Sequence, residues 1–318
     1  MRHDSATHIR SSYGSPVAGD RIQDPELARR LVLHEARAQQ TPARELRDLG
    51  DGWLFHDPND AEPFWNRVIA PRWPSEPVAF DRRLDEVITL FATLGRLPHV
   101  RPLPVGCEPA DLSRRLLAAG FQAMGADRRM VLVERERVTA LLAATEARVA
   151  AAFAGAVVGV TRQEVAARSS GNTGPRFVPS RRTWPGRRDW AEDASLVLGE
   201  AFGVEPARRI ALENDVLACV SRPGCSMLLV DIDGEPAAVA RRAWTRDGSY
   251  LSSIGTRPGF RGRGLGALAT LLVARDAIET EDAIVHLAVE VENEAAVRMY
   301  EGLGFRLVGD AAPDLLLH

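Results

Sequence analysis

The stretch GTRPGFRGRGLGALA, Gly255 to Ala269, combines glycines, arginines and the start of a leucine-rich helix. Glycine lets the backbone approach a ligand closely, and arginine attracts anions. The start of a helix adds unpaired N–H groups at the positive end of the helix dipole. Together these features predict a loop that cradles an anion. The elements on either side of the loop indicate which anion it holds.

Residues 261–266, RGRGLG, fit the pattern R-x-x-G-x-G and connect a predicted strand to a predicted helix. The N–H groups of such a loop can converge on the oxygens of a diphosphate. A Walker P-loop would need Gly-Lys-Ser/Thr where this chain has Gly264-Leu265-Gly266. A Rossmann loop would follow the first strand of a parallel βαβ unit, whereas this loop follows an antiparallel meander.

The meander is indicated by a period of two in hydrophobicity, with Asp-Gly turn signals at residues 233–234 and 247–248. Two helices precede it, and the first has a capping-box pattern at Asp189 and Glu192. The predicted order is helix, helix, three strands, helix, strand, helix, strand. The expected ranges are 189–203, 206–220, 227–232, 237–244, 250–256, 265–278, 283–291, 293–303 and 305–308.

The loop, its meander and VEVENEAAVRMYEGLGF, Val289 to Phe305, resemble the GNAT superfamily of N-acetyltransferases over residues 176–318. The resemblance implies an enzyme that moves an acetyl group from acetyl-CoA, its co-substrate, to a primary amine by direct attack in a ternary complex. Such an enzyme is an acyltransferase for groups other than aminoacyl groups. The implied fold class is α/β of the α+β type, with tandem GNAT-like domains. Each domain would have a mixed, mostly antiparallel twisted sheet flanked by helices.

The resemblance also assigns site residues. It implies that Tyr300 lies near the sulfur as general acid, and that Asn293 lies near the pantetheine arm. The strand ending at Ile254 and Thr256 would offer backbone groups to the pantetheine and the thioester carbonyl. The pyrophosphate would be held by Arg261, Gly262, Arg263, Gly264, Leu265, Gly266 and Ala267.

The residues of the last helix also have structural roles that follow from its ends. Asn293 is a natural N-cap for a helix that begins at Glu294. Gly304 is a natural residue just past the helix end, which makes Tyr300 and Phe305 the pair that touches in a Schellman motif. Part of this pattern is therefore helix architecture.

A general base is harder to assign. Some relatives carry a glutamate on the strand before the loop, but this chain has Ser252 and Ser253 there. Other relatives carry a carboxylate in the next strand, at the position where this chain has Ala288. Strand parity places Glu290 on the same face, so Glu290 is the candidate base and His286 the second. Three alternatives stay open: Glu213, Asp215 and a chain of water molecules.

The first half contains an echo of the second. LLAAGFQAMG, Leu116 to Gly125, resembles YEGLGFRLVG, Tyr300 to Gly309, which indicates two copies of one unit. The first copy has no glycine between Trp53 and Leu94, and Leu116 stands where the second copy has Tyr300. We therefore expect a degenerate GNAT-like domain that does not bind acetyl-CoA. It could complete the acceptor pocket, mediate dimerisation or stabilise its partner.

The expected organisation is a flexible tail at 1–24, a degenerate domain at 25–140, a helix and linker at 141–175, and a catalytic domain at 176–318. The basic stretch 176–188 is interpreted as a solvated loop. In the first domain the expected elements are helices at 26–40, 81–94 and 109–119, extended segments at 53–55, 65–70, 99–104 and 121–133, and a following helix at 137–151.

Composition limits the function further. A net charge of −3 over 318 residues does not favour nucleic acid or an acidic membrane surface as partner. Three scattered cysteines predict reduced thiols, no metal site and a cytoplasmic location. The acceptor would be a small-molecule or protein amine, and the chain a monomer or homodimer. The alternatives are a non-catalytic acyl-CoA-binding or sensor protein, or an acyltransferase with another acyl donor or acceptor.

Overall fold

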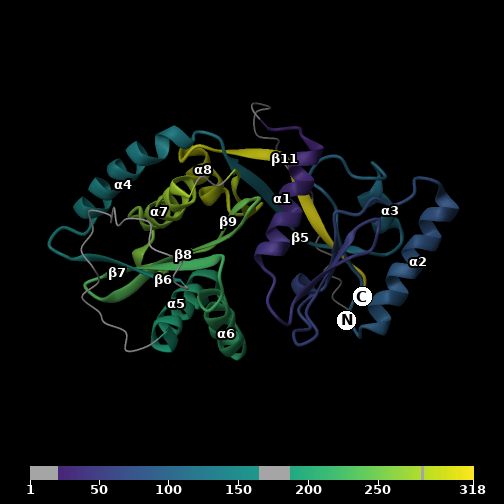
Figure 1. Cartoon of the computed structure of the whole chain (residues 1–318), viewed down its shortest axis with the longest axis horizontal. Coiled ribbons are helices and arrows are strands. Elements are labelled where there is room, and N and C mark those ends of the chain that lie inside the picture. The colour runs from purple at the N-terminus through teal and green to yellow at the C-terminus, as the bar shows by residue number, and fades with distance from the viewer. Residues whose placement is uncertain (1–20, 165–186, 281–282) are drawn as a thin grey trace, which may run out of the picture.

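The computed structural model describes residues 21–164, 187–280 and 283–318. Within them a single twisted sheet of eleven strands runs through the molecule, in the order β1-β2-β3-β4-β11-β5-β10-β9-β8-β7-β6. Helices cover both faces of this sheet, as Figure 1 shows. Most neighbouring strands are antiparallel, and β3–β4 and β9–β10 are parallel. The expected fold class is therefore confirmed.

The C-terminal half has the predicted order of elements. Its ranges are α5 (Arg187–Phe202), α6 (Arg209–Val220), β7 (Cys225–Ile232), β8 (Glu235–Thr245), β9 (Gly248–Thr256), α7 (Leu265–Glu279), β10 (Val285–Glu290), α8 (Glu294–Gly302) and β11 (Phe305–Leu316). The capping box expected at Asp189 is wrong, because α5 already includes Arg187. The last strand is also longer than residues 305–308, because its second part pairs with the N-terminal half.

The N-terminal half follows its predicted order except for β1, an edge strand that the sequence did not predict. Its ranges are α1 (Pro25–Ala38), β1 (Glu45–Asp48), β2 (Trp53–His56), β3 (Arg67–Ile69), α2 (Pro77–Thr93), β4 (His99–Arg101), α3 (Leu112–Ala118) and β5 (Gln122–Leu132). A short 3₁₀ helix, η1 (Pro63–Trp65), replaces the start of the strand expected at 65–70. Asp24 accepts hydrogen bonds from the N–H groups of Glu26 and Leu27 and so caps α1.

Two boundary expectations need correction. The segment expected as a linker contains strand β6 (Val158–Glu164), which pairs with β7 from Val158↔Ile232 to Glu164↔Ser226. Helix α4 (Val138–Ala152) packs against α7. We therefore propose that the C-terminal domain begins near Val138. The expected tail also ends earlier, because the N–H of Ile22 donates to the carbonyl of Leu307. Residues 1–20 and 165–186, including most of the basic stretch, lie outside the described residues.

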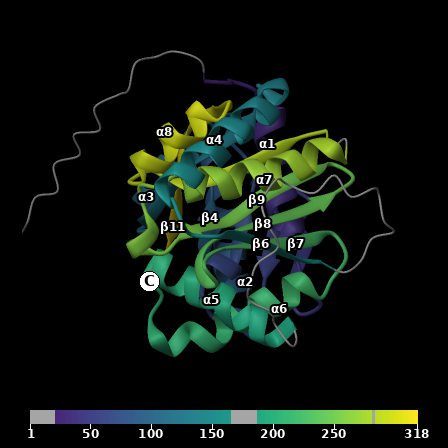
Figure 2. The same cartoon turned by 90° about the vertical axis from the view of Figure 1, so that its left-hand side faces the viewer.

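The helices form two layers on the C-terminal part of the sheet, as Figure 2 shows most clearly. On one face α4, α7 and α8 bury the apolar side chains of β7 to β10, including Leu228, Leu251 and Leu287. On the other face α5 and α6 pack around Trp190 and Leu229. Alternation of side chains along each strand produces these two cores.

Helix α1 spans the junction of the two halves. It packs on Phe55 and Ile69 of the N-terminal half, and its last residue, Ala38, joins the core formed by α5 and α6. Helices α2 and α3 pack on Leu54 and on neighbouring side chains of the opposite face. A single helix thus buries apolar surface from both halves.

Strand β5 of the N-terminal half joins the sheet of the C-terminal half, and β11 of the C-terminal half joins the sheet of the N-terminal half. They pair antiparallel from Phe305↔Leu132 to Leu316↔Gln122. The other edge of β5 pairs with β10, and the end of β11 pairs with β4 through Leu315↔Val100. The sheet of each half therefore contains a strand from the other half. The echo in the sequence corresponds to the units α3–β5 and α8–β11, which form this exchange.

The expectation of reduced thiols is wrong for two of the three cysteines. Cys219 at the end of α6 and Cys225 at the start of β7 form a disulfide, with Cα atoms 5.5 Å apart. Gly224, at a φ of +77°, helps the chain to reverse between them. Spacing along the sequence did not indicate this pair, because the helix-to-strand reversal brings the residues together. Cys107 is free.

The strand exchange makes the two halves interdependent. We expect residues 1–137 and 138–318, produced separately, to lack cooperative thermal unfolding, because each fragment loses a central sheet strand. Mixing or co-expressing the fragments should restore one cooperative transition, measured by circular dichroism. A fragment that unfolds cooperatively by itself, near the temperature of the whole chain, would contradict the interlocked arrangement.

Candidate active site

The two parallel strands β9 and β10 separate at one end. They pair through Val285↔Ser249, His286↔Tyr250 and Leu287↔Leu251, and pairing stops there. Beyond that point β9 pairs only with β8, and β10 only with β5. Ser253 has a φ of +50°, next to a register shift between β8 and β9. The edge of β9 beyond Leu251 therefore faces a gap, where its backbone groups are free to bind a ligand.

The glycine-rich loop lies at the end of this gap. Gly262 and Gly264 have φ values of +76° and +88°, which residues with a Cβ rarely adopt. Helix α7 starts at Leu265, and the N–H of Leu268 donates to the carbonyl of Gly264. The N–H groups of residues 265–267 come before that bond and have no acceptor within the helix. They form a free helix start at the place where the sequence predicts one, and such a start can bind an anion.

The arginines of the loop turn away from this helix start. Arg261 donates from its guanidinium to the carbonyls of Thr256 and Ala201, so it ties the loop to α5. The guanidinium of Arg263 lies 5.0 Å from the centre of the Phe153 ring. By contrast, the Nε of Arg148 on α4 lies 3.6 Å from the position that a Cβ on Gly264 would take. Arg148 thus lies beside the loop, and sequence reasoning missed it because α4 was assigned to a connecting segment.

A single cleft of about 1550 Å³ joins the loop, the gap and the start of α8. Apart from Arg263, every residue that the resemblance assigns to the site lines it, and so does Glu290: Ile254, Thr256, Arg261, Gly262, Gly264, Leu265, Gly266, Ala267, Glu290, Asn293 and Tyr300. Residues far apart in the sequence therefore meet in one cavity, as the motifs predict.

Tyr300 and Asn293 have the local geometry expected from the helix ends. Asn293 caps α8 by accepting a hydrogen bond from the N–H of Ala296 at 3.1 Å. The rings of Tyr300 and Phe305 are 5.9 Å apart, and Gly304 follows the helix at a φ of +93°. Within the described residues the hydroxyl of Tyr300 has no hydrogen-bond partner, although the residue is only 6% exposed. Burial raises the pKa of this phenol, which keeps it protonated.

The candidate bases differ in their positions. Glu290 is exposed and lines the cleft at the end of β10. His286 does not line it. Its imidazole is fully buried, with Nε2 2.8 Å from Nδ1 of His34. Burial, followed by the proximity of His34 and Arg129, lowers the pKa of His286 well below its usual value. Sequence reasoning ranked His286 second because strand parity does not show that a helix covers it.

The two carboxylates on α6 are also outside the cleft. Asp215 lies 3.4 Å from a guanidinium nitrogen of Arg44, at the contact between the halves. Burial raises the pKa of Asp215, and Arg44 acts in the opposite direction. Neither Asp215 nor Glu213 is among the residues that line the cavity.

Three residues of the N-terminal half line the cleft and were not expected there. They are Glu35 on α1, Phe64 on η1 and Asp127 on β5. Nothing in their local sequence indicates a site, because only the strand exchange and the crossing of α1 bring them to β10. Burial would raise the pKa of Glu35, but the guanidinium groups of Arg129, Arg101 and Arg67 outweigh it and lower this pKa to about 2.

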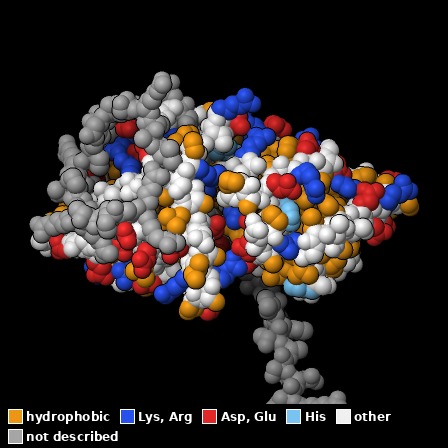
Figure 3. Space-filling model, turned by 60° about the horizontal axis from the view of Figure 1, so that its bottom comes forward, with side chains coloured by type: hydrophobic (Ala, Val, Ile, Leu, Met, Phe, Trp, Pro, Cys, Tyr) orange, Lys and Arg blue, Asp and Glu red, His pale blue; other side chains and the backbone are white. Residues whose placement is uncertain are grey.

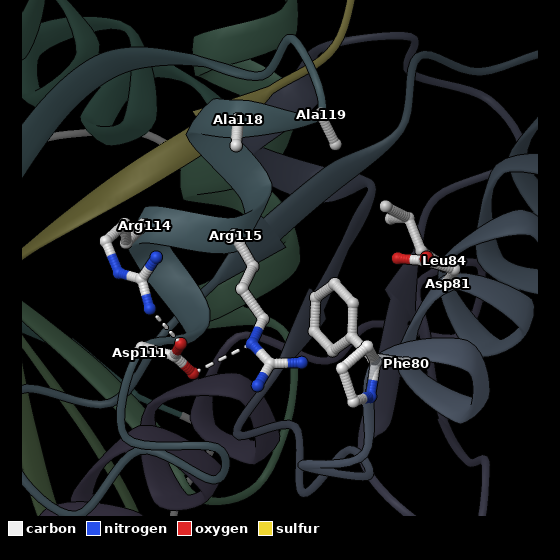
Figure 4. A pocket seen from close by; sticks show the side chains of 9 residues that line it. Phe80, Asp81, Leu84, Asp111, Arg114, Arg115, Ala118 and Ala119 are labelled. Carbon is white, nitrogen blue, oxygen red and sulfur yellow. Dashed lines mark hydrogen bonds and ion pairs between the residues drawn. The ribbon is translucent and has the colours of Figure 1, made fainter.

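A second hollow lies on the N-terminal half, between α2 and α3. It has a volume of about 430 Å³ and is lined by Phe80, Leu84, Arg115 and neighbours, as Figure 4 shows. Arg115 is already engaged, because it pairs with Asp111 at 2.9 Å and lies 4.9 Å from the Phe80 ring centre. The hollow has no glycine loop or separated strands, so the large cleft is the candidate site.

The surface and the remaining side chains add little to this picture. On the face in Figure 3, charged side chains of both signs are interspersed. No three His, Cys, Asp or Glu side chains in the described part of the chain are arranged to hold a metal ion. The helices of that part are also too short or too polar to cross a membrane.

Comparisons with known proteins agree with this geometry. Residues 232–312 match the family model described as FR47-like protein. The match includes the loop, β10, α8 and most of β11. The chain also has the fold of a GCN5-related N-acetyltransferase from Kribbella flavida, with a TM-score of 0.60, 20% identity, and coverage of 91% of this chain and 95% of that one.

The chain also has the fold of a tandem GNAT protein. A tandem GNAT protein from the clavulanic acid biosynthesis pathway shares the fold with a TM-score of 0.51 and 14% identity, over 87% of this chain and 83% of that one. The mycothiol acetyltransferase of Nocardiopsis dassonvillei is 38% identical over 81 residues. That match covers 22% of this chain and 24% of the relative, so it spans about a quarter of the relative's length.

The loop geometry can be tested with one glycine. We expect Gly264→Ala to weaken CoA binding at least about tenfold, because a Cβ at this positive φ strains the helix start and would lie 3.2 Å from Val149. Gly259→Ala is the matched control, since a Cβ there has no atom within 4 Å. Calorimetric titration with CoA measures both. Equal affinities for the two variants would contradict the assignment.

Proposed function

We propose that the chain is an acetyl-CoA-dependent N-acetyltransferase that acts on a primary amine. The observation that supports this most is the cleft itself, in which the separated edge of β9, the start of α7 and the phenol of Tyr300 meet. An extended ligand with a diphosphate at one end and a sulfur at the other matches this order of groups.

The residues present fit CoA. The N–H groups at the start of α7 would hold the pyrophosphate, and Arg148 would add a positive charge beside it. A Cβ on Gly266 would meet Thr256 at 3.5 Å and Met299 at 3.7 Å, so its absence leaves room between β9 and α8. The free edge of β9 at Ile254 and Thr256 would bind the amides of the pantetheine arm. Bound acetyl-CoA supplies a thioester carbonyl for attack.

The amine must lose a proton before it can attack, because its ammonium form has a pKa of about 10. Glu290, exposed and at the end of β10 in the cleft, would take that proton. The neutral nitrogen then attacks the thioester carbon. A backbone N–H of the β9 edge would stabilise the negative charge that develops on the carbonyl oxygen.

Collapse of the adduct breaks the C–S bond and releases a thiolate. Tyr300 would donate its phenolic proton to that sulfur, and the proton released by the new amide nitrogen restores the phenol. The net products are the acetylated amine, CoA with a free thiol and one proton. The hydroxyl of Tyr300 supports this role, since the residue lines the cleft and no group in the described residues bonds to it.

A direct assay tests the proposal. Incubation of the chain with labelled acetyl-CoA and a panel of primary amines should give acetylated product and free CoA. Binding of CoA without turnover on any amine would favour a non-catalytic acyl-CoA-binding protein instead. Turnover only with another acyl-CoA, or on a hydroxyl acceptor, would identify a different acyltransferase.

Removing the Tyr300 hydroxyl should separate catalysis from binding. We expect Tyr300→Phe to lower kcat by about 100-fold, a typical contribution of a general acid. The dissociation constant for CoA should stay within about twofold, because the ring still packs on Phe305. Steady-state kinetics and calorimetry measure the two quantities. An unchanged kcat would remove Tyr300 from the mechanism.

Replacing the proposed base should make the rate depend on the free amine. We expect Glu290→Gln to lower kcat/KM for the amine by about 100-fold at pH 7. The deficit should shrink toward pH 10 as more amine is neutral in solution. Glu294→Gln is the control, because Glu294 is exposed and pairs with Arg298 outside the reaction. If both variants behave alike across this pH range, Glu290 is not the base.

A further inference from the structure

The cleft extends beyond the acetyl position to the face of the sheet that α1 covers. There it is lined by Tyr250, Ala288 and Glu290 from the C-terminal half, and by Glu35, Phe64 and Asp127 from the N-terminal half. We call these six residues the acceptor chamber. Tyr250 stacks on His286, which lies against His34 of α1, so the chamber opens on the side opposite α7 and α8. An acceptor entering here would reach the gap between β9 and β10 from the free side.

Two carboxylates of the chamber stand side by side. Asp127 and Glu290 are direct partners in the antiparallel β5–β10 ladder. Cβ atoms of such partners lie about 4.5–5.5 Å apart, and like charges in this arrangement repel. Asp127 pairs with Arg101 through Oδ2, while its Oδ1 is buried with no hydrogen-bond partner. Glu290 has no ion pair within the described residues. A cation between the two would relieve the repulsion.

Tyr250 supplies an independent observation. The residue is 5% exposed and lines the chamber, yet its hydroxyl has no hydrogen-bond partner within the described residues. Because the residue lines the cleft, this hydroxyl is open to a ligand there. Burial raises the pKa of Tyr250 and keeps the phenol neutral. Its oxygen can therefore accept a hydrogen bond from an ammonium group without a charge penalty.

The side chains that line the chamber favour a cation over an anion. Glu35 is already balanced by buried guanidinium groups, at 3.5 Å from Arg67 and 3.7 Å from Arg101. The arginines that line the cleft lie elsewhere: Arg148 on α4, Arg261 in the loop and Arg298 on α8. None of the six lining side chains is basic, although buried arginines lie against Asp127, Glu35 and the ring of Phe64.

We propose that the acceptor chamber binds a small alkylammonium, with the ammonium group held by Asp127, Glu290 and the hydroxyl of Tyr250. The N-terminal half thereby supplies part of the acceptor site, through Asp127 and Phe64. This inference rests on the proposed function, because it identifies the acceptor class of the same cleft. A diamine fits best, since one ammonium can stay on Asp127 while the other nitrogen reacts.

The test measures binding rather than turnover. The probe is 1,3-diaminopropane, and β-alanine is the comparison because it replaces one ammonium by a carboxylate at the same length. Saturation-transfer NMR on the whole chain, with and without CoA, gives both dissociation constants. We expect 1,3-diaminopropane to bind at least about tenfold more tightly than β-alanine. Equal binding, or no binding of the diamine, would overturn the proposal.

A matched pair of variants shows whether Asp127 contacts the diamine directly or acts only through the buried arginines. Asp127 and Asp314 have side chains 18% and 21% exposed, and both contact the buried arginines Arg101 or Arg67, but only Asp127 lines the chamber. We expect Asp127→Asn to weaken diamine binding at least about tenfold and Asp314→Asn to leave it within twofold. Equal weakening by both would show that the arginine network alone is responsible.

Thermal unfolding and CoA affinity check that each variant is folded. If Asp127→Asn does not fold, Tyr250→Phe decides, because it removes only one oxygen. We expect Tyr250→Phe to weaken diamine binding at least about threefold, and unchanged binding would overturn the proposal. CoA binding with no acetylation of any amine would refute the proposed function while leaving the diamine result to be read separately.

Discussion

The antiparallel pair formed by β5 and β11 is the constraint on which the rest of the molecule depends. These strands run from Phe305↔Leu132 to Leu316↔Gln122 and lie at the centre of the eleven-stranded sheet. Since each one also pairs with a strand of the other half, neither sheet has its full set of strands alone. Hydrogen bonds at the centre of a sheet leave no exposed edge at the junction, which fixes the two halves relative to each other.

The position of the candidate site follows from this arrangement. The edge of β10 that faces away from β9 pairs with β5. The strands β9 and β10 can therefore separate beyond Leu251 without leaving β10 unpaired. The separation opens the backbone of β9 to a ligand and aims the start of α7 at one end of the gap. The same pairing carries Asp127 of β5 to a place beside Glu290. The cleft and the proposed acceptor chamber are thus two consequences of one strand exchange.

The N-terminal half differs from the C-terminal half where a ligand would bind. In β4, Arg101 follows His99 by two residues, as Ala288 follows His286 in β10. The small side chain of Ala288 lines a cavity, whereas the buried guanidinium of Arg101 fills the corresponding space and pairs with Asp127. Burial lowers the pKa of Arg101 to about 10, which still leaves it charged at neutral pH. We propose that this half lost its own ligand space and now shapes the acceptor chamber of the other.

The sequence alone determined the elements of the C-terminal half and the position of the loop. Local signals carry this information: Asp-Gly turns, an R-x-x-G-x-G loop, the Asn293 cap and Gly304 after the last helix all act within a few residues. The sequence also predicted that Tyr300, Glu290 and the loop share a site. Strand β6 escaped prediction, because its residues Thr161 to Glu164 are polar and become a strand only by pairing with β7.

Only the tertiary structure decided which other residues reach that site. Glu35, Phe64 and Asp127 lie more than 100 residues before β10 in the chain, and no local pattern distinguishes them from other residues of the N-terminal half. It also decided against His286, which parity had placed toward the cleft but which α1 covers through His34. The physical reason is the same in each case. Periodicity shows which face a side chain occupies, but long-range pairing and packing decide what lies against that face.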